Sequence, residues 1–207
     1  MARILTVSDT VDIDADADAL YTLISDPTQM PKWSPENRGA TVLNPAENGV
    51  AFVGMTFEGR NKRGRAAWIT RCTVTAADPG RRFAFRVHAI GVKKPRIRAA
   101  NASWEYRFEP TAPGKTRVTE IWSDDRTSWP DPVVAVFDRV VTSGKSFPEF
   151  QRINIRKTLD ALKQAAEAVT GPGELVHGER ESFVGGYSGQ RSGPAARSPG
   201  PDGGGTA

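Results

Sequence analysis

The sequence is poor in the residues that build disulfides and metal centres. It has one cysteine, Cys72, and two histidines, His88 and His177, in 207 residues. A single cysteine excludes an internal disulfide, and two distant histidines do not have the ligand spacing of a zinc site. We therefore expect no metal and no cofactor.

Long apolar runs are missing as well. No stretch approaches the ~18 apolar residues that a membrane-spanning helix needs. Near its start the chain soon reaches Ser8, Asp9 and Asp12 instead of the apolar region of a signal peptide. We therefore expect a cytoplasmic protein. Nucleophile-elbow, phosphate-loop and nucleotide-binding motifs are also absent, which argues against those enzyme classes.

The composition changes after Val169. Between Thr170 and Ala207, 15 of 38 residues are Gly or Pro, which exceeds the ~25–30% typical of low-complexity disorder. The sequence therefore predicts one folded domain over residues 1–169 and a disordered tail over residues 170–207. A lid or interaction arm built on Phe183, Val184 and Tyr187 is the alternative for this tail.

In the first part of the body, apolar residues alternate as they do in a strand with one buried face: Leu5, Val7, Val11 and Ile13. A short helix follows, with Asp16 expected to cap its first turn and Asp26-Pro27 to end it. From Gly39 to Ser123 the chain reads as successive strands separated by turn signals. The aromatic residues of these strands share one parity and the charged residues the other, which predicts an antiparallel sheet with one apolar face.

After Asp131-Pro132 the spacing becomes helical, with apolar residues at Val133, Val136, Phe137 and Val140. A second helix start follows, because Ser146 and Glu149 have the spacing of a capping box. The buried stripe of this last helix is expected at Ile155, Leu159, Leu162 and Ala166. A sheet with one apolar face must pack against such a helix, which predicts an α+β fold.

Several short motifs follow this pattern: Asp26, Trp33-Ser34-Pro35-Glu36, Gly54, Phe57, Gly59, Asn61, Gly64, Trp68, Val74, Pro79-Gly80, Phe83 and Thr116 through Glu120. With them the chain resembles the SRPBCC superfamily, which includes START domains and the major birch pollen allergen. The motifs look most like a bacterial polyketide cyclase/dehydrase-like subgroup, over roughly residues 3–168. The resemblance implies the helix-grip fold: a seven-stranded curved antiparallel sheet wrapped on a long C-terminal helix, with two short helices after the first strand.

Such folds enclose an apolar cavity between sheet and helix, so the resemblance implies a small hydrophobic ligand. The ligand-contacting residues expected on the inner face are Trp33, Phe57, Asn61, Trp68, Thr70, Phe85, Trp104, Tyr106, Trp122 and Phe137. Asn61 and Thr70 either hold a polar group of the ligand or satisfy the backbone of their own strands.

Two carboxylates are candidates for proton transfer. Glu120 lies on the inward parity between Val118 and Trp122, where burial would raise its pKa and suit a general acid or base. Its alternative is a pairing with a nearby arginine or a free backbone amide. Glu36 either faces the mouth of the cavity or fixes its own loop. His88 falls on the positions of its strand that face outward, away from the expected cavity. Cys72 is expected to be a buried, inert thiol.

The basic residues of the body concentrate in two segments, Arg60, Lys62, Arg63 and Arg65, then Lys93, Lys94, Arg96 and Arg98. The family topology would place both at the mouth, together with Trp33 and Trp129. A basic rim could receive an anionic ligand or contact an anionic membrane surface; its alternative is ordinary solubilising charge. Nucleic-acid binding is not expected, because no recognition helix or stacking platform accompanies the charge.

These features favour a protein that binds a small hydrophobic ligand in an internal cavity. One alternative is a polyketide cyclase, aromatase or dehydratase that holds a flexible acyl chain while Glu120 or Glu36 moves a proton. A protein-interaction module is the other alternative.

Overall fold

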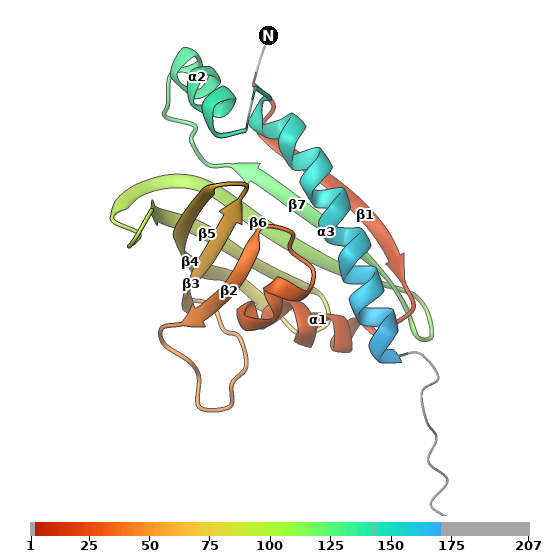
Figure 1. The fold of residues 1–207 in the computed structure, drawn as a ribbon. Coiled ribbons are helices and arrows are strands. Elements are labelled where there is room, and N and C mark those ends of the chain that lie inside the picture. Colours follow the sequence, from red (N-terminus) through yellow and green to blue (C-terminus); the bar gives the residue numbers. More distant parts are fainter. Residues whose placement is uncertain (1–2, 143, 171–207) are drawn as a thin grey trace, which may run out of the picture. The chain divides into compact units, whose positions relative to one another are not determined.

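One antiparallel sheet forms most of the fold (Figure 1). The computed structural model describes residues 3–142 and 144–170, and the predicted tail lies outside them except for Thr170. Seven strands have the spatial order β1-β7-β6-β5-β4-β3-β2. The elements in chain order are β1 (Thr6–Ile13), α1 (Ala17–Ser25), η1 (Pro27–Lys32), β2 (Asn37–Val42), β3 (Thr56–Arg63), β4 (Ala66–Asp78), β5 (Arg82–Gly91), β6 (Ile97–Ala112), β7 (Lys115–Asp124), α2 (Asp131–Val141) and α3 (Phe147–Thr170).

The long helix α3 packs on the sheet next to β1 and β7 (Figure 1). Its predicted stripe is confirmed, since Ile155, Leu159 and Leu162 are fully buried. The helix begins with the predicted capping box: the Ser146 amide and hydroxyl both donate to Glu149 Oε2, at 2.9 and 2.8 Å. The α+β helix-grip fold with two short helices after β1, α1 and η1, is therefore confirmed.

The two faces of the sheet differ as the parity of the residues predicts. Phe83, Val118 and Trp122 are buried on the inner face. The outer face carries ion pairs across neighbouring strands, such as Arg71–Glu58 at 2.6 Å and Arg82–Glu105 at 2.8 Å. None of the described helices is both long and apolar enough to cross a membrane.

Two local predictions were wrong. The Asp16 side chain makes no capping hydrogen bond to α1; its backbone carbonyl instead accepts from Leu20 N at 3.0 Å. Leu5 is 40% exposed because it precedes β1, so the alternation of the strand does not extend to it. Asp9, which interrupts the apolar parity of β1, pairs with Arg156 of α3 at 2.5 Å.

The strand pairing brings three connections to one end of the sheet. The β3–β4 hairpin closes at Arg63–Ala66, and the β5–β6 hairpin closes beyond Ile90–Ile97. The end of β7 lies at the same end, because Asp124 pairs with Ala102 of β6. Helix α2 follows β7 after the segment 125–130 and lies beside the start of α3 (Figure 1). This end of the fold surrounds the candidate site.

Candidate functional site

A cavity of about 750 Å³ lies between the inner face of the sheet and the helices. Its wall comes from η1 and the segment after it, from the end of β3 and the β3–β4 turn, from β4 to β7 and the segment after β7, and from α2 and α3. Eight of its lining residues are aromatic: Trp33, Trp68, Phe85, Trp104, Tyr106, Trp122, Phe137 and Phe147. Phe85 and Trp104 stack with ring centres 5.8 Å apart, as do Trp122 and Phe147 at 6.1 Å. Such a wall suits an apolar ligand of small-molecule size.

Most of the predicted ligand-contacting residues line this cavity: Trp33, Trp68, Thr70, Phe85, Trp104, Tyr106, Trp122 and Phe137. Phe57 and Asn61 are not among the lining residues. Phe57 is 1% exposed and packs edge-on against Phe85, which separates it from the space. Asn61 Nδ2 donates to Gly59 O at 3.1 Å and to Thr70 Oγ1 at 3.3 Å, so it satisfies its own strands.

Glu120 lies in the cavity wall with only 2% of its surface exposed. Tyr106 donates its hydroxyl to Glu120 Oε1 at 3.2 Å, so the partner is neither an arginine nor a backbone amide. Burial raises the pKa of Glu120 to about 8. The carboxyl is therefore largely protonated near neutral pH, where it can donate a hydrogen bond as well as accept one.

Four buried polar atoms in the cavity wall have no hydrogen-bond partner among the described residues: Asn101 Nδ2, Glu120 Oε2, Trp122 Nε1 and Gln151 Oε1. Glu120 and Trp122 are two residues apart on β7 and so share its inner face. Gln151 comes from the first turns of α3. The cavity thus combines an apolar wall with a small polar region that offers both donors and an acceptor.

Glu36 also lines the cavity, but Arg63 binds its carboxylate through both Nε and Nη2. The guanidinium of Arg63 lies 3.8 Å from the ring centre of Phe150 on α3. These two contacts tie the segment after η1 to the β3–β4 hairpin and to α3. Glu36 therefore fixes its own loop, which is the second of its two predicted roles.

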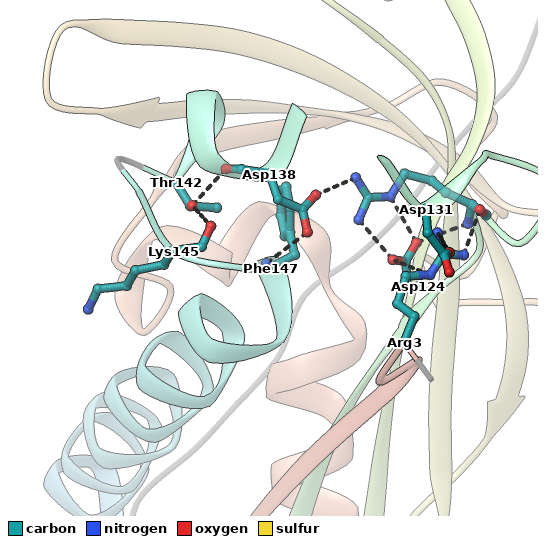
Figure 2. Close-up of polar contacts among 8 residues, drawn as sticks. Arg3, Asp124, Asp131, Asp138, Thr142, Lys145 and Phe147 are labelled. Carbon is teal, nitrogen blue, oxygen red and sulfur yellow. Dashed lines mark hydrogen bonds and ion pairs between the residues drawn. The ribbon is translucent and has the colours of Figure 1, made fainter. Parts of the chain in front are cut away.

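Arg126 is a charged lining residue that the sequence did not single out. It is 3% exposed, donates from Nε and Nη2 to the two oxygens of Asp124 at 2.8 Å each, and donates from Nη1 to Asp138 at 2.8 Å. The other oxygen of Asp138 accepts from Phe147 N at 3.0 Å (Figure 2). One buried cation therefore joins β7, α2 and α3. Its sequence signal was Asp138, an acid that directly follows the apolar run from Val133 to Phe137.

Of the eight predicted rim cations, Arg63 and Arg65 line the cavity. The other six are exposed but are not among its lining residues: Arg60, Lys62, Lys93, Lys94, Arg96 and Arg98. The two tryptophans expected at the rim differ in their placement. Trp33 is buried in the wall, and Trp129 packs against Phe137 at 5.6 Å outside the lining.

His88 and Cys72 lie away from the cavity lining. Thr73 Oγ1 is 3.2 Å from His88 Nδ1, and burial lowers the pKa of this histidine. Burial raises the pKa of the Cys72 thiol to about 12, which keeps it protonated and unreactive, as predicted. Within residues 3–142 and 144–170, no group of three or more His, Cys, Asp or Glu side chains could hold a metal ion.

The family described as "Polyketide cyclase / dehydrase and lipid transport" matches residues 5–167. No curated protein matches the sequence.

Solved structures share the fold at low sequence identity. A START superfamily protein from Mycobacterium smegmatis superposes with a TM-score of 0.58 at 15% identity, over 80% of this chain and 99% of that one. The di-domain aromatase/cyclase BexL of the BE-7585A biosynthetic pathway gives 0.56 at 20% identity, over 82% of this chain and 48% of that one. A protein from Chromobacterium violaceum gives 0.54 at 15% identity, over 79% and 99% of the respective chains.

Proposed function

The chain belongs to the polyketide cyclase/dehydrase and lipid-transport family of the SRPBCC superfamily, and from this premise we propose that its cavity holds a small hydrophobic molecule with one polar end. The observation that carries the proposal is the aromatic cavity of about 750 Å³ with a neutral carboxyl in its wall. Drug-sized ligands occupy pockets of about 300–1,000 Å³ in which a few polar groups fix orientation.

The unpartnered atoms define what the polar end must offer. A buried polar atom without a hydrogen bond costs roughly 1–3 kcal/mol, so a ligand that pairs with it recovers this energy. Protonated Glu120 and the Trp122 indole would both donate, which suits a carbonyl or ether oxygen. Gln151 Oε1 would accept from a hydroxyl or amide of the ligand.

The proposal can be tested by filling the cavity. Ala102 lies in the wall and is 7% exposed, so Ala102→Trp would place an indole in the ligand space. We expect this variant to bind the neutral apolar dye N-phenyl-1-naphthylamine at least tenfold more weakly than the wild type, as measured by fluorescence titration.

The matched control is Thr75→Trp, which adds the same bulk at an exposed position of β4 that is not among the lining residues. It should bind the dye as the wild type does. If Ala102→Trp keeps the circular dichroism spectrum of the wild type and binds the dye unchanged, the cavity is not the binding site.

A second candidate function is proton-transfer catalysis, which the raised pKa of Glu120 favours. A carboxyl with a pKa of about 8 is a competent general acid near neutral pH. Native mass spectrometry of the freshly purified protein would identify a co-purified compound. We expect Glu120→Gln to bind that compound but not to convert it if the protein is an enzyme. Equal conversion by wild type and variant would eliminate Glu120 as the proton carrier.

The remaining proposals concern the rim and the cellular compartment. Exposed cations on the two hairpins at the cavity end of the sheet support contact with an anionic partner, either the acidic group of a ligand or a membrane surface. The absence of long apolar runs supports a cytoplasmic location.

A further inference from the structure

Helix α2 leaves its apolar side largely exposed. Its apolar residues Val133, Val136, Phe137 and Val140 have the i, i+3, i+4, i+7 spacing that normally faces a core. All four are exposed, with Val136 at 64% and Val140 at 76%. The two buried residues that face the body are instead Val134 and Asp138, on a side roughly a third of a turn away.

The buried ion pair explains this orientation. Asp138 points inward because Arg126 and Phe147 N take one carboxylate oxygen each (Figure 2). An unpaired Asp138 would be costly in this buried position, so its pairing with Arg126 outweighs the burial of the valines and fixes the rotation of α2 about its axis. The apolar stripe is therefore held outward. Phe137 and Val140 border the cavity, while Val133 and Val136 face solvent only.

The neighbouring surface is also apolar and is strongly cationic. The β5–β6 hairpin lies at the same end of the sheet and exposes Val92 at 77% and Ile97 at 64%. Three segments at this end of the fold carry exposed cations: Arg65 on the β3–β4 hairpin, Lys93, Lys94, Arg96 and Arg98 on the β5–β6 hairpin, and Arg139 and Lys145 around the end of α2. Asp138 is paired within the protein and Asp125 pairs with Arg86 at 3.0 Å, so neither acid offsets these charges.

We propose that this face, formed by α2 and the tip of the β5–β6 hairpin, docks the mouth of the cavity on an anionic lipid bilayer. Exposed valines and an isoleucine flanked by lysine and arginine fit the boundary between headgroups and acyl chains, where apolar and electrostatic attraction add. A second copy of this chain fits poorly, because a symmetric contact would bring two cationic rims together. The proposal rests on the rim contact proposed above, assigns it to a membrane surface, and does not depend on which molecule occupies the cavity.

The test is co-sedimentation of the full chain with vesicles. We expect binding to vesicles of phosphatidylcholine mixed with phosphatidylglycerol, weaker binding to phosphatidylcholine alone, and loss of binding in high salt. The double variant Val136→Asp, Val140→Asp should reduce binding to the mixed vesicles at least tenfold. The double variant Lys93→Glu, Arg96→Glu should reduce it by a similar factor, since each cation near an anionic surface contributes about fivefold.

The control is Val50→Asp, Val53→Asp, because these valines are 48% and 63% exposed in the β2–β3 loop at the opposite end of the sheet. It should bind vesicles as the wild type does. Equal losses in both valine variants, or no binding of the wild type, would overturn the proposal. So would sedimentation velocity that shows a wild-type dimer which only the Val136, Val140 variant dissociates.

Discussion

At the scale of single residues, Glu120 makes the most specific contribution to the cavity. Its carboxyl is buried on β7, receives one hydrogen bond from Tyr106 and keeps Oε2 unpartnered among the described residues. Alternation along β7 predicted the inward position. The identity of the partner depended on Tyr106 lying opposite Glu120 on β6, which is a matter of strand register.

The raised pKa of Glu120 predicts how stability depends on pH. Between its ordinary value of 4.5 and about 8, the folded protein keeps a proton that the unfolded chain has lost. The contribution of Glu120 to stability is therefore fully present below pH 4.5 and declines as the pH rises to about 8. Glu120→Gln does not titrate. We expect its stability relative to wild type to rise by on the order of a few kcal/mol between about pH 5 and about pH 8.

Urea denaturation of wild type and Glu120→Gln at several pH values measures this difference. A constant difference across the range would mean that Glu120 is not buried as a neutral acid. Tyr106→Phe serves as a control, because it removes the hydrogen bond to Glu120 and leaves the carboxyl to titrate.

At the scale of elements, α2 depends on one buried ion pair. Its only buried side chains are Val134 and Asp138 among those that the structure describes in this helix. The apolar spacing predicted the helix. It could not predict the rotation, because the burial of Asp138 depends on Arg126, which reaches it from the segment after β7.

Removing the carboxylate should therefore loosen this helix. We expect Asp138→Asn to destabilise the fold by about 1–3 kcal/mol, because it removes the charged partner of Arg126 on α2, while Asp124 still pairs with Arg126. Hydrogen exchange should accelerate in α2 before it does in β7. Asp131→Asn is the matched control: this acid of the same helix is 75% exposed and lies 3.8 Å from Arg3, so its loss should cost less than about 1 kcal/mol. Equal effects of the two variants would contradict a tethering role for Asp138.

At the scale of the whole described body, the sheet and α3 form two layers that are filled at one end and hollow at the other. Around β1, the packing of α3 is dense, with Ile155, Leu159 and Leu162 fully buried. Towards the β3–β4 and β5–β6 hairpins, aromatic residues from both layers line the cavity of about 750 Å³. The proposed ligand and the proposed membrane contact therefore belong to the same end of the molecule.

The sequence by itself determined the helix-grip fold, the solvent-exposed and the apolar face of the sheet, the buried stripe of α3 and most of the aromatic cavity wall. Those features follow from the periodicities of strands and helices and from the motifs of one family, which are local in the chain. Only the tertiary structure decided that Tyr106 pairs with Glu120 and that Arg63 binds the carboxylate of Glu36. It also decided that Arg126 joins β7 to both helices and that α2 leaves its valines exposed. Each of these contacts joins separate segments of the chain, so it depends on register and packing that no local pattern encodes.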